Sequence, residues 1–215
     1  MNKICFYVFL ISVAACFSLT AYCEESTKEL IDKIESLYKT YNDMKAEFIQ
    51  ESYNATSETK RKATGFYYTK KPNLMRWEYN EPEEQLFLFD GKFLWFHFVE
   101  DNQIVKSNIE NTDSGLRMFL DFLSSLKKIE EDFSITKEIK DDILKLELKP
   151  KKDIASLSLL NVYLKQSTFE LVKTEQFDHF ENKTTIYFNK IEINKGLKED
   201  KFRFKVPDGV EVIEN

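Results

Sequence analysis

The two histidines are the first place to look for chemistry, because imidazole titrates near neutral pH and binds metal ions. His97 lies in the aromatic stretch FLWFHF, and His179 follows Asp178 in the stretch FDHFEN. Neither histidine has a second imidazole or a thiol at the spacing of a zinc site. A single His–Asp neighbour pair is more typical of a turn than of a catalytic dyad. The sequence therefore predicts no metal site and no histidine-based general base.

Paired carboxylates are the next candidates, since two acidic groups can divide general acid and general base roles. Three pairs stand beside expected turns and helix ends, at Glu83-Glu84, Glu130-Glu131 and Asp141-Asp142. Charged side chains at such positions are ordinarily solvated. The chain also lacks a glycine-rich phosphate loop and a nucleophile elbow around a serine. We therefore expect a protein that is not an enzyme and that uses no cofactor.

The N-terminus has the pattern of an export signal. Lys3 precedes an almost unbroken apolar run that is shorter than the roughly 20 residues needed to span a bilayer. Ala21 and Cys23 then place small residues at the −3 and −1 positions of a cleavage site. We expect residues 1–23 to be a signal peptide.

Cysteine usage bears on the same segment, because Cys5, Cys16 and Cys23 all lie within it. Cleavage after Cys23 would leave no thiol, so residues 24–215 must fold as a single domain without disulfide bonds. The alternative is that Cys16, which follows two alanines, becomes a lipid-bearing N-terminus. Lipidation would tether the mature protein to a membrane.

Composition argues against a nucleic-acid binder and in favour of a large apolar interior. The chain has 37 acidic and 31 basic residues and a net charge of −6 at pH 7. A nucleic-acid surface needs clustered Lys and Arg, which an acidic chain of this kind does not supply. Aromatic residues make up 14% of the sequence, with 19 Phe, whereas Gly and Pro are scarce.

The segment 27–44 has helical periodicity. Leu30, Ile34, Leu37 and Tyr41 follow one another at spacings of three and four, with charged residues between them. This pattern predicts an amphipathic helix. Ser26 or Thr27 can cap its start, because a hydroxyl accepts hydrogen bonds from first-turn amides.

Beyond that helix, the apolar period changes to two, which predicts strands with one wet and one dry face. The clearest alternating sets are Met44, Ala46 and Phe48; Met75, Trp77 and Tyr79; Leu144, Leu146 and Leu148; and Ile186 with Phe188. Asp-Gly at 90–91, between two apolar runs, indicates a hairpin.

Two strands depart from the alternation and are apolar on both faces, at 86–89 and 93–98. Both of their faces must be covered, and the amphipathic segment 113–126 is the natural cover. An antiparallel sheet of about eleven strands tends to curl. We therefore predict a mainly β protein with some α structure, an unclosed antiparallel β-barrel covered by a lid of short helices.

The surplus of large aromatic residues has two interpretations. They can line a cavity for an apolar ligand, since pockets are typically apolar and aromatic. They can equally form an ordinary core, and composition alone does not separate the two.

A longer motif bears on this choice. It combines a glycine, a basic residue before proline, a strand containing Trp, a second proline, and a hairpin with the pattern DGK-x-LW. These features are Gly65, Lys71-Pro72-Asn73-Leu74, Trp77, Pro82, and Asp90-Gly91-Lys92 with Leu94-Trp95. The ordered set resembles the signature of the periplasmic outer-membrane lipoprotein carriers, the LolA family. Further matches are Phe48, Gln50, Leu146–Pro150, Phe202–Phe204 and Pro207–Val210.

The resemblance implies an unclosed β-barrel with a helical lid and a periplasmic, non-enzymatic carrier, most simply a monomer. Its partners would be acylated lipoproteins, an inner-membrane lipoprotein-releasing ABC exporter and an outer-membrane lipoprotein receptor. By position, the residues facing the lipid would be Met75, Trp77, Tyr79, Leu86, Leu88, Leu94, Phe96 and Phe98, with Phe119, Leu120 and Leu123 on the lid.

One position departs from the family pattern. The family usually has Arg before the first proline, where it latches the lid, and this chain has Lys71. Lysine keeps the charge but lacks the planar, five-donor guanidinium.

Other functions remain open at this point. An outer-membrane-anchored lipoprotein receptor and an envelope lipid-sensing protein would share the same fold, and lipidation of Cys16 would favour the receptor. An exported lipid hydrolase and a purely structural envelope protein are rivals of a different class.

Overall fold

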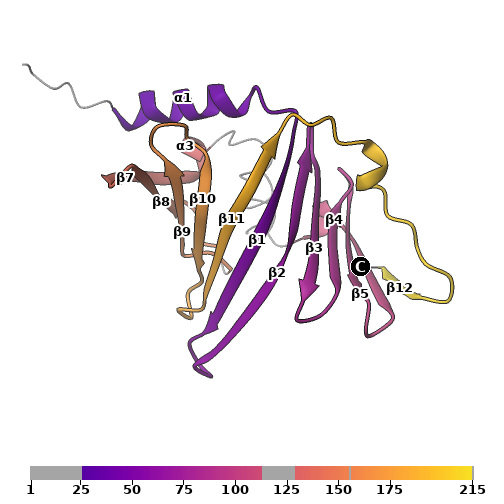
Figure 1. Cartoon of the computed structure of the whole chain (residues 1–215). Coiled ribbons are helices and arrows are strands. Elements are labelled where there is room, and N and C mark those ends of the chain that lie inside the picture. Colours follow the sequence, from indigo (N-terminus) through magenta and orange to yellow (C-terminus); the bar gives the residue numbers. More distant parts are fainter. Residues whose placement is uncertain (1–25, 113–128, 155, 215) are drawn as a thin grey trace, which may run out of the picture.

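A computed structural model describes residues 26–112, 129–154 and 156–214, and one large sheet dominates it (Figure 1). The order in the sheet is β12-β6-β5-β4-β3-β2-β1-β11-β10-β9-β8-β7. The strands are β1 (Asp43–Asn54), β2 (Thr59–Lys70), β3 (Leu74–Glu81), β4 (Gln85–Phe89), β5 (Phe93–Phe98), β6 (Gln103–Asn108), β7 (Phe133–Lys140), β8 (Ile143–Pro150), β9 (Leu159–Lys165), β10 (Leu171–Phe177), β11 (Lys183–Ile193) and β12 (Glu211–Glu214).

The sheet is open, as predicted. β7 and β12 stand at its two ends and do not pair with each other, and every neighbouring pair is antiparallel except β12 with β6. The described residues thus form twelve strands, one more than expected. The added parallel strand comes from the C-terminal tail, which reaches β6 by a long crossing rather than a hairpin (Figure 1).

Helices are few among the described residues: α1 (Thr27–Tyr38), α3 (Ile129–Asp132) and the 3₁₀ turns η1 (Ile109–Asn111) and η2 (Glu199–Phe202). Ser26 caps α1 with Glu29 in a reciprocal capping box, as its position predicts. The helix ends at Tyr38 rather than near Met44. Asp43 and Met44 instead begin β1, where their backbone pairs with β2.

We define the inner face of the sheet as the one that carries Phe48, Trp77 and Val162, and the outer face as its opposite. The helix α1 lies on the inner face, across β8 to β10 (Figure 1). Ile31 and Ile34 are almost fully buried there. One half of the curved sheet is thus covered by α1.

The outer face behind β3 to β6 is covered by the C-terminal segment. Phe202 is 1% exposed, and the Phe204 ring stacks on Trp95 at 4.9 Å between ring centroids. On the same face, Lys201 Nζ donates to Glu78 at 3.1 Å. The strands at 86–89 and 93–98 are therefore covered on their outer side by the C-terminal segment, which includes the 3₁₀ turn η2. The segment 113–126, which we predicted as their cover, lies outside the described residues.

Glu175 on the outer face joins β9, β10 and β11 through a cluster of donors. Tyr163 Oη donates to its carboxylate at 2.7 Å, and Lys173 and Lys183 lie at 3.1 and 3.2 Å. Burial favours the neutral acid, but these donors outweigh burial and hold the pKa of Glu175 at about 2.

Replacing Glu175 with Gln is therefore expected to cost stability only where the carboxylate is charged. A depressed pKa stabilises the folded state above about pH 4.5, and that contribution fades as the pH falls towards 2. Urea midpoints of the native protein and E175Q should differ most at pH 7, and the difference should shrink below pH 4.5 and vanish only as the pH approaches 2. Tyr163→Phe, which removes one donor, should show the same trend at smaller amplitude. A midpoint difference independent of pH would contradict this account.

Candidate ligand-binding site on the inner face

A large cavity of about 1000 Å³ opens on the inner face. That volume is at the upper end of typical small-molecule pockets. Its walls come from β1 to β5 on one side and from β10 and β11 on the other. The large apolar and aromatic residues of the lining are Trp77, Tyr79, Leu86, Phe87, Phe96, Phe98 and Ile186.

Trp77 is the centre of an aromatic cluster beneath this cavity. The Trp77 ring lies 4.9 Å from Phe48 and 4.5 Å from Tyr67 between centroids, and Phe188 lies 6.1 Å away. Such edge and tilted contacts stabilise aromatic pairs beyond their area of burial. The cluster fixes the Trp77 ring, so that the floor of the cavity is formed before any ligand arrives.

Gly65 allows this cluster to close. It pairs with Phe48 on one side and with Tyr79 on the other, and those two rings meet at 5.0 Å. A Cβ at this position would lie 1.9 Å from the backbone oxygen of Glu78. Only glycine permits β2 and β3 to approach this closely.

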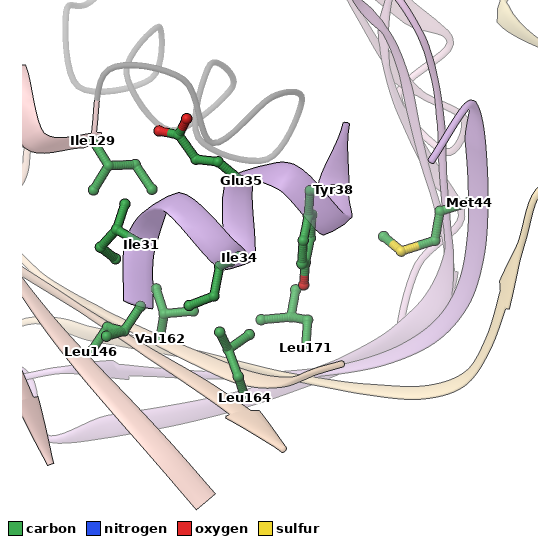
Figure 2. A pocket seen from close by; sticks show the side chains of 10 residues that line it. All are labelled: Ile31, Ile34, Glu35, Tyr38, Met44, Ile129, Leu146, Val162, Leu164 and Leu171. Atoms are coloured by element: carbon green, nitrogen blue, oxygen red, sulfur yellow. The ribbon is translucent and has the colours of Figure 1, made fainter. Parts of the chain in front are cut away.

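A second, much smaller cavity of about 30 Å³ lies beneath α1. Figure 2 shows Ile31 and Ile34 pointing from the helix towards Val162, Leu164 and Leu171. The space could hold little more than a water molecule, and its walls are almost entirely apolar. A long apolar ligand could therefore enter this half of the sheet only if α1 moved away.

The end of α1 is tied to the strand hairpin by Lys71. Its Nζ donates to the backbone oxygens of Tyr38 at 3.0 Å and Lys39 at 2.8 Å. The Tyr38 oxygen also accepts from the Tyr41 amide at 3.1 Å. A cation at a helix C-terminus is favourable, because the last carbonyls carry partial negative charge. Tyr38 adds a second tie, donating from Oη to the Phe169 oxygen at 3.1 Å. Burial raises the pKa of Tyr38, which keeps this hydroxyl a donor.

Lys71→Met is expected to loosen α1, because it removes both charge-assisted hydrogen bonds while keeping a long side chain. Such bonds contribute about 2 kcal/mol each in proteins. Hydrogen exchange of the α1 amides should become faster, and Lys71→Arg should restore much of the protection. Lys28→Met, which removes only an exposed pair with Asp32, is the matched control. Equal protection in the native protein and K71M would rule out the tie.

Ten of the eleven predicted lipid-facing residues divide into three groups. Trp77, Tyr79, Leu86, Phe96 and Phe98 border the large cavity. Met75 and Leu94 lie on the same face but are buried in the core, at 1% and 0% exposure. Phe119, Leu120 and Leu123 lie outside the described residues.

Leu88 does not belong to this face. It pairs with Arg76 and Trp95, both of which point to the outer side, and it is fully buried there. Leu86 has the same parity and reaches only the border of the cavity. The inward residue between them is Phe87, whose ring lies 4.8 Å from Phe96. Phe87 could have been found by pairing β4 against Trp77, since residues opposite one another share a face.

The described part of the chain has neither a membrane-spanning helix nor a metal site. None of its helices is long and apolar enough to cross a membrane. Within the same residues, no group of three or more His, Cys, Asp or Glu side chains could hold a metal ion.

Comparison with solved structures supports the fold. An uncharacterized conserved protein from Thermus thermophilus superposes with a TM-score of 0.56 at 13% identity, covering 89% of this chain and 100% of that one. A DUF1329 family protein from Desulfovibrio piger superposes with a TM-score of 0.51 at 13% identity, over 81% of this chain and 95% of that one. At such identities the likeness concerns the fold alone.

Comparison of sequences gives the family. Residues 39–205 match the model described as "Outer membrane lipoprotein carrier protein LolA". A relative from Nitrosomonas europaea, named "Outer-membrane lipoprotein carrier protein", is 30% identical over 172 residues, 78% of this chain and 81% of its own length. One of the same name from Azotobacter vinelandii is 27% identical over 209 residues, 97% of this chain and 98% of its own. With the open sheet and its aromatic cavity, these matches establish that the chain belongs to the outer membrane lipoprotein carrier (LolA) family.

Proposed function

We propose that this protein is a periplasmic carrier that shelters the acyl chains of lipoproteins in the inner-face cavity. The observation that carries the proposal is the pairing of an open, aromatic-lined cavity of about 1000 Å³ with relatives named as outer-membrane lipoprotein carriers. The protein would bind and release its cargo without breaking covalent bonds. On this view residues 1–23 direct export and residues 24–215 form the carrier domain.

The energetics of acyl burial constrain how transfer must work. Each buried methylene is worth roughly 0.8 kcal/mol, so three long chains represent on the order of tens of kcal/mol relative to water. Release into water is therefore too slow to be useful. Cargo must pass directly from an inner-membrane ABC exporter into the cavity, and from the cavity into an outer-membrane receptor that is the better host.

The α1 helix would act as a movable cover in this cycle. While Lys71 holds the end of α1, the space beneath the helix is only about 30 Å³. Displacing α1 would join the small cavity beneath the helix to the large cavity, and more apolar surface would become accessible to acyl chains. Phe119, Leu120 and Leu123 remain candidates for a second part of the cover.

Native mass spectrometry tests the proposal directly. The full chain is produced with its own N-terminus in a Gram-negative host, purified from the periplasm without detergent, and sprayed under native conditions. We expect a fraction with the added mass of an acylated lipoprotein, and a mature protein that starts after Cys23. A known carrier of the family, purified from the same host in the same way, is the positive control. If that carrier retains lipoprotein and this protein does not, the proposal is overturned.

The same spectrum separates the carrier from the membrane-anchored receptor of this fold. A receptor would show a diacylglyceryl mass on Cys16, whereas a carrier would show none. The receptor is not favoured, because the curated relatives that span almost the whole chain are named as carriers.

A further inference from the structure

The inner face of β1 changes character part of the way along the strand. It runs through Met44, Ala46 and Phe48, all almost fully buried, and then through Gln50 and Ser52. Alternation places these five side chains on the same side of the sheet. The cavity therefore has an apolar part near the aromatic cluster and a polar part nearer the hairpin end of β1.

The register extends this change across three neighbouring strands. Ser52 pairs with Arg61 on β2 and with Thr184 on β11, and Thr184 pairs in turn with Gln176 on β10. We call Gln50, Ser52, Arg61, Gln176 and Thr184 the polar band. All five line the large cavity. Their strand ends lie together at the bottom of Figure 1, on the side away from α1.

The polar band begins where the aromatic floor ends. Tyr79 Oη donates to Gln50 Oε1 at 3.0 Å, and Gln50 Nε2 donates to Ser52 Oγ at 3.2 Å. Burial raises the pKa of Tyr79 to about 12, so its hydroxyl stays a neutral donor. This chain of hydrogen bonds orients the amide and hydroxyl groups along the cavity wall.

Arg61 is the cation of the band, and it is exposed. Within the described chain, its guanidinium forms no ion pair and no side-chain hydrogen bond. A guanidinium offers five donors in a planar fork, which suits carbonyl oxygens as well as anions. Its neighbours Gln50, Ser52, Gln176 and Thr184 are uncharged donors and acceptors, which suit ester and amide groups.

From this juxtaposition we propose that the polar band binds the polar junction of the cargo. That junction comprises the ester and amide groups that link the acyl chains to the N-terminal residue, with the first peptide groups that follow. The inference rests on the proposed carrier function and adds an orientation: acyl chains lie against Trp77 and Phe96, and the polypeptide leaves past Arg61. The order of apolar and polar surfaces along the cavity matches the order of groups along such a ligand.

Two probes separate the two parts of the cavity. Diphenylhexatriene is a hydrocarbon dye without polar groups, and it reports on the aromatic part. A synthetic triacylated cysteinyl peptide with an uncharged peptide portion needs both parts. We expect Arg61→Met and the double variant Ser52→Val with Thr184→Val to bind the dye like the native protein and the lipopeptide at least tenfold more weakly. Lys60→Met is the matched control, because Lys60 precedes Arg61 but pairs with Tyr53 on the outer face.

Each outcome has a defined meaning. If both variants bind both probes normally, the polar band has no role in recognition, while the carrier function stands. If they lose both probes equally, the residues shape the cavity rather than recognise the junction, and the inference is also overturned. If the native protein binds neither probe, the proposed function itself fails. Normal dye binding in the variants also reports that they are folded.

Discussion

Replacing Gly65 with Ala is expected to lower the free energy of unfolding by about 3 kcal/mol, at the upper end for an overpacked core. The added Cβ would lie 1.9 Å from the Glu78 backbone oxygen and 2.9 Å from Phe48 Cε1. A side chain can change rotamer, but a backbone oxygen held in the β2–β3 ladder cannot. The two strands must separate, and the ring contact between Phe48 and Tyr79 is lost with them.

Gly209 provides the control for this experiment. Its φ of +77° also favours glycine, but nothing lies within 4 Å of the position of its missing Cβ. Gly209→Ala therefore carries only the conformational cost of a left-handed residue, about 1 kcal/mol. Urea unfolding followed by Trp fluorescence measures both variants. Equal losses at the two positions would show that the close approach at Gly65 is not what limits stability.

Replacing Phe96 with Glu is expected to abolish acceptance of lipoprotein while leaving the protein folded. Phe96 lines the large cavity and is partly exposed, so a carboxylate there can stay hydrated in the empty protein. An acyl chain that enters would have to strip that water, and burying an unpaired charge costs far more than one methylene contributes. We expect cargo to be absent from the native mass spectrum of F96E.

The matched control is Phe180→Glu, because Phe180 is 73% exposed in the turn between β10 and β11. It introduces the same charge into the same protein, away from the cavity lining. F180E should keep its cargo and its stability. If F96E retains cargo at the native level, the acyl chains bind elsewhere. The large cavity would then no longer be the proposed acyl-chain site.

Strict alternation made much of the inner face predictable. Met75, Trp77 and Tyr79 alternate with charged or polar residues, and the structure puts all three on one face with Phe48. The same holds for Leu144, Leu146 and Leu148 on β8, which are almost fully buried. Where one face of a strand is exposed to solvent, the polar residues mark that face, and the sequence alone shows which residues point inward.

Prediction failed where that record was missing. The run LFLF is apolar on both faces, so nothing within it shows whether Leu88 or Phe87 points inward. Only the pairing of Phe87 with Trp77 identifies Phe87 as the inward residue. The end of α1 was misplaced because Tyr41 continues the helical spacing, whereas Asp43 already belongs to a strand. Asp43 is buried and its carboxylate accepts from the backbone amides of Lys195 and Gly196, a contact between distant segments that periodicity cannot reveal.

The C-terminal segment on the outer face bears on what happens after cargo has been delivered. If apolar residues of the cavity wall were buried only on the inner face of the sheet, much of the core of the empty protein would depend on the ligand. Leu88 and Ile104 are instead fully buried on the opposite side of the sheet, away from the cavity. This outer part of the core is therefore expected to stay packed when the cavity is empty. A single molecule can then remain native through repeated rounds of collection and delivery. The number of copies that the cell needs would depend on how many lipoproteins are in transit at one time, and not on the total number delivered.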